Sequence, residues 1–334
     1  MSIDKKMKGQ FFTVTNPFNH DLMFKWINLI TNFKSKTLLE PFAGCNNILD
    51  MIEEIGYRND WKCYDIDPES VFLTEDYKYK VETRDTLANY PSEFEVAITN
   101  PPYLSKSSAT RSGIEFPVTK HNDLYKLALE KMLENNKYVA AIIPESFLTQ
   151  ELFHNRLFGV ISLTMRMFED TDCPVCLALF IPEEEKESKD NFKIYSNDRL
   201  IGNYLDLKTF LKESILNIDF KFNESNGEIG LLAIDNTKTN SIKFVLGETI
   251  ESDKIKISSR SITRIAFENK NNLNIQKLID KANELLEKER ESTSDLFFTA
   301  FKGLRSDGKY RRRLDFKNAK RILNKALEEL LQWI

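Results

Sequence analysis

Hydrophobic positions in the first half of the chain alternate between helical and strand-like spacing. The helical spacing predicts helices over 22–33, 47–55 and 124–133. Short apolar runs around them predict strands at 36–40, 61–65, 95–99, 138–143, 160–168 and 175–181. The run at 138–143 is almost continuously apolar, as expected of a strand that is buried on both faces. We therefore expect an α/β fold, with an open, mostly parallel sheet and helices on both sides.

A polar stretch interrupts this alternation at residues 182–191, which are rich in Glu and Lys. Such stretches join domains, so we place a boundary there, with a first domain over 1–182 and a second over 192–334. Beyond it we expect short strands near 229–234, 242–246 and 254–258. Two amphipathic helices follow over 275–286 and 319–330. The second domain is therefore expected to be smaller and of mixed α+β type.

The amino-acid composition argues against membrane-spanning, secreted and disulfide-rich classes of protein. Hydrophobic residues make up 41% of the 334 positions, and 24 of them are Phe, which is enough to bury a core. No apolar run approaches the roughly 18 residues that span a bilayer, and the charged N-terminus shows no secretory signal. The four cysteines form no disulfide framework, and no second pair gives Cys173 and Cys176 a metal-ligand set. We expect a soluble, cytoplasmic protein that holds no metal and does not bind a membrane.

The net charge of −4 hides an uneven distribution. Residues 1–182 carry a net charge of −6, and residues 183–334 carry +2. Within the second part, positions 302–325 hold ten Lys and Arg against two Asp. This cluster fits a polyphosphate partner better than a membrane, with a solvated basic face as the alternative.

The motif Thr99-Asn100-Pro101-Pro102-Tyr103 directly follows an apolar strand. Its two prolines restrict the backbone and make the turn rigid. The amide oxygen of Asn100 and the carbonyl of Pro101 are then adjacent acceptors beside the ring of Tyr103. Two such acceptors suit an amine with two hydrogens, and the ring suits the face of a base, so the motif indicates an adenine site. The alternative is a turn that merely ends the strand.

Small and acidic residues follow the other strands of the same predicted sheet. Gly44 lies where the first strand passes into its helix, which lets a ligand approach the backbone and the helix N-terminus. Asp65 ends the second strand, where a carboxylate can accept hydrogen bonds from both hydroxyls of a ribose. Asp85 follows the third strand and is suited to an adenosine amine. Each acidic residue alone has a solvated loop position as its alternative, but their order and spacing favour a nucleoside cofactor.

In these motifs, residues 5–181 resemble the catalytic domain of S-adenosylmethionine-dependent DNA adenine methyltransferases, with the motif order of the gamma group. The resemblance implies a Rossmann-like class I methyltransferase sheet, followed by a DNA target-recognition domain. Residues 8–13 resemble the segment that caps the methionine end of the cofactor. By position, the resemblance assigns S-adenosylmethionine to Gln10, Phe11, Thr13, Glu40, Phe42, Gly44, Asn46, Asp65, Ile66, Asp85 and Asn100. It assigns the target adenine to Asn100, Pro101, Pro102 and Tyr103.

Two positions depart from the family pattern. Asn46 stands where the cofactor turn usually has a second glycine, and Val14 stands where the N-terminal segment often has proline. Asn is the residue other than glycine that best tolerates a positive φ, so we interpret Asn46 as a variation that keeps the turn. The family also keeps a base-contacting strand pair near Phe168 to Phe180, in which we assign no stacking residue.

The resemblance implies duplex DNA as the partner. It leaves two alternatives open, a restriction endonuclease that acts on the same site or an orphan methyltransferase without one. A base must leave the helical stack to reach the Asn-Pro-Pro-Tyr turn. Contacts with DNA are expected from Lys106, Arg111, Arg305, Lys309, Arg311, Arg312 and Arg313. The same turn also resembles methyltransferases that act on adenine in RNA or on a glutamine side chain. A DNA-binding module that has lost catalysis is the alternative from another class.

Overall fold

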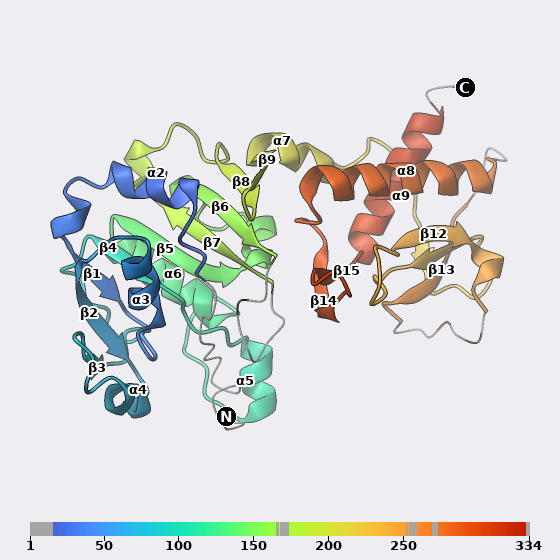
Figure 1. Ribbon diagram of the computed structural model, residues 1–334. Coiled ribbons are helices and arrows are strands. Elements are labelled where there is room, and N and C mark those ends of the chain that lie inside the picture. The colour runs from blue at the N-terminus through green and yellow to red at the C-terminus, as the bar shows by residue number, and fades with distance from the viewer. Residues whose placement is uncertain are drawn as a thin grey trace. The chain divides into compact units, whose positions relative to one another are not determined.

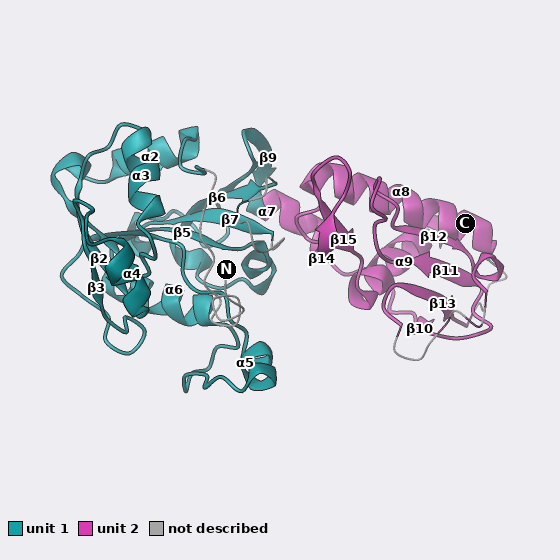
Figure 2. Ribbon diagram, turned by 60° about the horizontal axis from the view of Figure 1, so that its bottom comes forward, with its two compact units in different colours: residues 1–204 teal, residues 205–334 magenta. Residues whose placement is uncertain are grey.

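The computed structural model describes residues 16–164, 167, 174–251, 253, 255, 259–268 and 273–331. The chain divides into two compact units, Met1–Tyr204 (unit 1) and Leu205–Ile334 (unit 2), which Figure 2 distinguishes by colour. The division falls after residue 204 rather than at 182–192. Strands β8 (Lys193–Ser196) and β9 (Arg199–Asn203) follow the polar stretch and still pair with the sheet of unit 1, which explains the difference.

Unit 1 is built on one sheet, which among the described residues has nine strands (Figure 1). Its order is β3-β2-β1-β4-β5-β7-β6-β8-β9. The strands before β8 are β1 (Thr37–Glu40), β2 (Asp60–Asp65), β3 (Val81–Thr83), β4 (Val96–Thr99), β5 (Tyr138–Pro144), β6 (Leu157–Leu163) and β7 (Val175–Phe180). Strands β1 to β5 are parallel to one another, whereas β7 is antiparallel to both β5 and β6. The predicted α/β fold with a mostly parallel sheet is confirmed.

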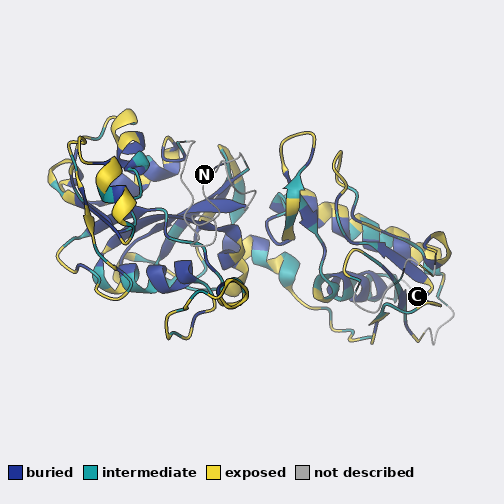
Figure 3. Cartoon of the chain, turned by 90° about the horizontal axis from the view of Figure 1, so that it is seen from below, coloured by how far each residue is buried: buried dark blue, intermediate teal, exposed yellow. Residues whose placement is uncertain are grey.

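The core of unit 1 surrounds β5, all of whose residues are buried (Figure 3). Successive side chains of a strand point to opposite faces, so this strand is buried on both, as its apolar run predicts. On one face, Ala140 and Ile142 join a cluster with the buried sides of α2 (Asp21–Leu29) and α3 (Asn47–Glu54). Helix α2 ends earlier than predicted, because Ile30 is extended and Asn32 takes a φ of 56°.

The other helices of unit 1 follow strand ends or loops. They are α4 (Pro68–Leu73), α5 (Lys106–Ser112), α6 (Leu124–Asn135) and the short α7 (Tyr204–Leu207), whose last residues belong to unit 2. Helix α4 begins where the side chain of Asp67 accepts a hydrogen bond from the amide of Glu69 and Pro68 occupies the first turn. Among the described residues, no helix is both long and apolar enough to cross a membrane.

Unit 2 has the expected mixture of strands and helices. Its main sheet is antiparallel, in the order β10 (Lys221–Phe222), β13 (Ile262–Ala266), β11 (Ile229–Leu232) and β12 (Lys243–Leu246). The apolar sides of α8 (Ile275–Thr293) and α9 (Phe316–Leu331) share a core with this sheet. A hairpin of β14 (Thr299–Leu304) and β15 (Tyr310–Arg313) completes the unit. The strand predicted at 254–258 falls largely outside the described residues, and β13 lies beyond it.

Candidate active site

A cavity of about 940 Å³ lies where the parallel strands of unit 1 end. Its walls come from the loops after β1, β2, β3 and β4, as expected because the carboxyl ends of parallel strands meet at one edge of a sheet. This volume is at the upper end of the range for small-molecule sites. The cavity brings together seven residues predicted from the sequence, namely Phe42, Gly44, Asp65, Ile66, Asp85, Asn100 and Pro102.

The turn after β1 has the backbone that its sequence indicates. Gly44 has a φ of 53° and Asn46 a φ of 64°, so both take the left-handed conformation. The interpretation of Asn46 as a substitute for glycine in this turn is thus confirmed. Its side chain does not line the cavity but is buried, and its Nδ2 donates to the carbonyl of Tyr79 at 2.7 Å. Asn46 therefore shapes the turn and anchors it to the chain before β3.

Asp65 connects this turn to the end of β2. One carboxylate oxygen accepts a hydrogen bond from the amide of Gly44 at 2.9 Å, and the other accepts from the amide of Asp67 at 2.8 Å. Burial raises the pKa of Asp65, although these backbone hydrogen bonds partly oppose the shift. Each oxygen keeps a second lone pair, so the oriented carboxylate can still accept from a ligand hydroxyl.

Further carboxylates line the cavity near Asp65. Asp67 and Glu69 follow it in sequence, and Asp85 is held in its loop because its Oδ1 accepts from the amides of Leu87 and Ala88 at 3.1 and 3.0 Å. A wall with this much negative charge attracts a positively charged ligand and suits amine and hydroxyl donors.

Glu40 is not a lining residue of the cavity. It is 1% exposed, and its Oε1 accepts from the amide of Phe42 at 3.1 Å and from the hydroxyl of Thr99. Its Oε2 is buried with no hydrogen-bond partner among the described residues. Burial raises the pKa of Glu40 to about 8, so the carboxyl is mostly protonated at neutral pH. Its hydrogen bonds tie the end of β1 to the end of β4, directly before Asn100.

The Asn-Pro-Pro-Tyr motif is divided between the cavity and the core. Asn100 and Pro102 line the cavity, whereas Pro101 is buried and Tyr103 is half-buried against the core of unit 1. The Tyr103 hydroxyl lies 2.5 Å from Oδ1 of Asn100 and 2.6 Å from the carbonyl oxygen of Ile142. The sequence indicates the ring as a partner for a base. It does not reveal this hydroxyl contact, which depends on the neighbouring strand β5.

An apolar wall of the cavity is missed by the sequence analysis. Three elements contribute to it. Helix α4 supplies Leu73, and helix α6 supplies Leu124 and Leu127. The loop that follows α5 supplies Ile114, Pro117 and Val118. Helix α6 shows an apolar pattern in the sequence, but the pattern alone does not distinguish residues that face a cavity from residues that face a core. Lys106 and Arg111 lie on α5 beside this wall and are exposed. Gln10, Phe11, Thr13 and Phe168 lie outside the described residues.

One known family model matches the part of the chain that forms this cavity. Residues 25–159 match the family model of the Eco57I restriction-modification methylase. The match covers β1 to β5 and the whole cavity wall, and it supports a methyltransferase of the restriction-modification type. Unit 1, in which this match lies, has an α/β fold with a mostly parallel sheet. No curated protein sequence matches the chain.

Several solved structures are similar to part of this chain. A candidate class I S-adenosylmethionine-dependent methyltransferase from Listeria monocytogenes is 19% identical, with a TM-score of 0.40 over 52% of this chain and 61% of that one. The type I restriction-modification methyltransferase subunit from Streptococcus thermophilus is 15% identical, with a TM-score of 0.40 over 56% and 47%. The type IIG restriction endonuclease BpuSI is 15% identical, with a TM-score of 0.40 over 57% and 27%. The chain thus spans less than two thirds of the length of each.

Five of the basic residues predicted to contact DNA lie beyond the methylase match, in unit 2, namely Arg305, Lys309, Arg311, Arg312 and Arg313. Arg305 and Arg312 are buried, at 7% and 6% exposed, which corrects the expectation that both are surface contacts. In the strand β15 alternate residues point inward, so Arg312 cannot share the exposure of its neighbours Arg311 and Arg313, which are half-buried. Only Lys309 of this group is fully on the surface.

Proposed function

We propose that this chain is a site-specific DNA adenine methyltransferase, which modifies the exocyclic N6 amine of an adenine rotated out of duplex DNA. The observation that carries the proposal is the single cavity that joins the Gly44 turn, Asp65 and Asp85 to Asn100. The restriction-modification methylase match over residues 25–159 supports DNA as the substrate. It also supports a role beside a restriction endonuclease that recognises the same site.

The residues of the acidic wall fit S-adenosylmethionine. The oriented carboxylate of Asp65 suits the two ribose hydroxyls, Asp85 suits the adenine amine, and Gly44 lets the ligand lie close to the backbone. Phe42 and Ile66 supply apolar contacts beside these polar groups. When bound, S-adenosylmethionine supplies a methyl group attached to a positively charged sulfur.

Asn100 and Pro101 prepare the target amine. The amine of adenine is a poor nucleophile because its lone pair is delocalised into the ring. When Oδ1 of Asn100 and the carbonyl of Pro101 accept its two hydrogens, they favour a pyramidal nitrogen and orient its lone pair. The methylated nitrogen is acidic enough to lose its extra proton to water, so no general base is required before the transfer.

The apolar wall complements this polar turn. Rotating a base out of the duplex costs a few kcal/mol, which contacts in the protein must offset. Leu104, Ile114, Leu124 and Leu127 offer apolar surface to the base and exclude water around the reacting amine.

The decisive experiment is expression of the full chain in a host that lacks adenine methylation, followed by mapping of modified bases in its genome. N6-methyladenine in one fixed short motif is the expected result. Unmodified DNA together with labelled RNA or labelled protein, after incubation with S-adenosylmethionine that carries a labelled methyl group, would overturn the proposal.

Replacement of Asn100 tests the site itself. Asn100→Ala removes one acceptor of the amine, and we expect kcat to fall by about 100-fold or more while the Kd for S-adenosylmethionine changes by less than about threefold. Steady-state methyl transfer and isothermal titration give the two quantities. Asn89→Ala, at an exposed position outside the cavity wall, is the matched control. Equal losses of turnover and of cofactor affinity in Asn100→Ala would contradict this role.

A further inference from the structure

The basic residues of unit 2 divide into an inward and an outward group. Arg305, Arg312 and Arg321 are buried, and Arg321 pairs with Glu289 through contacts of 2.8 and 2.9 Å. These guanidinium groups are enclosed by the fold and are not available to a large polyanion. The sequence cluster at 302–325 therefore overstates the surface charge, and the outward cations determine what this part of unit 2 can bind.

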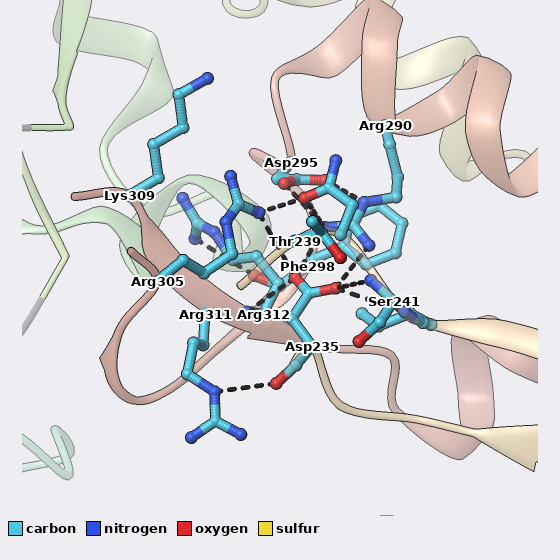
Figure 4. Close-up of polar contacts among 12 residues, drawn as sticks. Asp235, Thr239, Ser241, Arg290, Asp295, Phe298, Arg305, Lys309, Arg311 and Arg312 are labelled. Carbon is cyan, nitrogen blue, oxygen red and sulfur yellow. Dashed lines mark hydrogen bonds and ion pairs between the residues drawn. The ribbon is translucent and has the colours of Figure 1, made fainter. Parts of the chain in front are cut away.

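A buried carboxylate organises the inward group. Asp235 is 0% exposed, and its two oxygens accept from Nη1 and Nη2 of Arg290 at 2.9 and 2.7 Å (Figure 4). It also accepts from the backbone amides of Ser241 at 2.8 Å and Arg312 at 3.2 Å. Burial raises the pKa of Asp235, but the hydrogen bonds and charge of Arg290, together with the backbone amides of Ser241 and Ile242, outweigh that effect and lower the pKa overall. The carboxylate therefore stays ionised and holds α8, the loop 235–241 and β15 together.

Direct contacts also join the loop 235–241 to the turn of the β14–β15 hairpin. The amide of Ser306 donates to the carbonyl of Thr237 at 2.7 Å, and Nη1 of Arg305 donates to Oδ1 of Asn240. The amide of Asp235 donates to the carbonyl of Arg312 at 3.0 Å. The loop and the hairpin turn thus form one continuous edge, which we call the hairpin edge (residues 235–241 and 299–313).

Three lysines of the hairpin edge are exposed. They are Lys238, Lys302 and Lys309, and among the described residues none of them forms an ion pair with a carboxylate. Lys309 points away from the buried network (Figure 4). The nearby carboxylate of Asp307 pairs instead with Arg305, at 2.9 Å. The positive charge of this surface is therefore largely uncompensated.

Arg311 differs from these lysines because its conformation is restrained. Its Nε donates to the carbonyl of Asp235 at 2.8 Å and its Nη1 to the carbonyl of Lys302 at 3.3 Å. The guanidinium lies 4.9 Å from the ring centre of Phe301. Within the described part of the chain it meets carbonyl groups and a ring but no carboxylate. Such a side chain keeps its charge and loses less conformational entropy when it binds an anion.

We propose that the hairpin edge contacts the phosphate backbone of duplex DNA through Lys238, Lys302, Lys309 and Arg311. The choice of DNA as the polyanion rests on the proposed function. A protein with a net charge of −4 needs such a local positive surface to approach a polyanion. Phosphate contacts release counterions, so they weaken as salt increases and do not depend on base sequence.

The test compares two double variants of the full chain that lose the same charge. Lys302→Gln with Lys309→Gln removes two cations of the hairpin edge, and Lys221→Gln with Lys277→Gln removes two exposed cations elsewhere in unit 2. Binding to a duplex that contains the modified motif, and to one that lacks it, is measured by fluorescence anisotropy over a series of salt concentrations. Circular dichroism confirms that both variants are folded.

The hairpin-edge variant is expected to bind both duplexes about tenfold or more weakly, and its plot of log K against log salt should lose roughly 0.9 of slope per contact. The control variant should match the wild type. If the two variants bind DNA with equal affinity and equal salt dependence while the wild type still methylates DNA, the proposed contact between the hairpin edge and DNA is wrong. The proposed function is then unaffected. A wild type that binds duplex RNA but not duplex DNA overturns both.

Discussion

At the scale of single residues, the hydroxyl of Tyr103 can fix the orientation of the Asn100 side chain. Its hydroxyl is within hydrogen-bond distance of both Oδ1 of Asn100 and the carbonyl of Ile142, and it has one hydrogen to donate. When it donates to Asn100, it fixes the orientation of the amide and leaves a second lone pair on Oδ1 for a ligand. We therefore expect Tyr103 to position Asn100, in addition to any contact that its ring makes with a base.

The variant Tyr103→Phe separates these two roles because it removes the hydroxyl and keeps the ring. We expect kcat for methyl transfer to fall by about threefold to tenfold, the worth of one hydrogen bond, with little change in the KM for DNA. Tyr125→Phe, on a ring that lies 6.3 Å from Tyr103, serves as the comparison. Full activity of Tyr103→Phe would show that the hydroxyl contact has no part in turnover.

Glu40 leads to a prediction about stability and pH. Its ordinary pKa of 4.5 rises to about 8 in the folded protein, so between these values the folded state holds a proton that the unfolded chain has lost. The unfolding free energy contributed by Glu40 therefore decreases as pH rises through this window. We expect Glu40→Gln, which does not titrate, to flatten the pH dependence of the urea midpoint of unit 1. Parallel profiles for the variant and the wild type would contradict the raised pKa.

At the scale of elements, the hydrophobic periodicity of the sequence predicts those helices and strands whose formation is determined by residues close together in the chain. The strands β1, β2, β4 and β5, and the helices α3 and α6, lie within a few residues of their predicted positions. The turn at Gly44 and the edge that it shares with Asp65 and Asn100 follow from the same local signals, because parallel strands place their ends together.

Strands whose pairing or burial depends on residues far away in the sequence cannot be predicted from the hydrophobic periodicity. β8 and β9 are short and partly exposed, so the sequence assigns their residues to the second domain, and only their pairing with β6 and with each other places them in unit 1. The β14–β15 hairpin looks like a basic loop because its burial depends on Asp235, which lies more than 70 positions before Arg312 in the sequence. Composition counts Arg305 and Arg312 as surface charge for the same reason.

Loss of the buried carboxylate of Asp235 should loosen unit 2. Asp235→Asn removes one of the two carboxylates that pair with the buried Arg290, and Asp295, at 2.7 Å, remains. We expect a cost toward the lower end of the roughly 3–5 kcal/mol that breaking a buried ion pair typically takes. We expect faster amide hydrogen exchange in α8, the loop 235–241 and the hairpin, with unit 1 as the internal reference. Asp307→Asn, on a side chain that is 44% exposed, is the matched control and should change exchange only at the hairpin turn. Unchanged exchange in Asp235→Asn would contradict this structural role.

At the scale of the whole molecule, the two proposed activities lie in different units. Every residue that lines the cavity belongs to unit 1, and every residue of the hairpin edge belongs to unit 2. S-adenosylmethionine should therefore slow amide hydrogen exchange in residues 40–48, 65–73 and 85–88 and leave residues 205–331 unchanged. Asp65→Ala should abolish this protection. Protection that is equally strong in unit 2 would mean that the cofactor site is not the cavity described above.

The position of the division at Tyr204 and Leu205 has an evolutionary consequence. If unit 2 is the target-recognition domain that the sequence resemblance implies, a recombination event at this point would join an unchanged transfer enzyme to a new C-terminal unit in a single step. The hybrid would mark a different set of genomic sites, and the old set would lose its protection against the companion nuclease. Inheritance of such hybrids would therefore require a nuclease that changes its own target at the same time, or one that is lost.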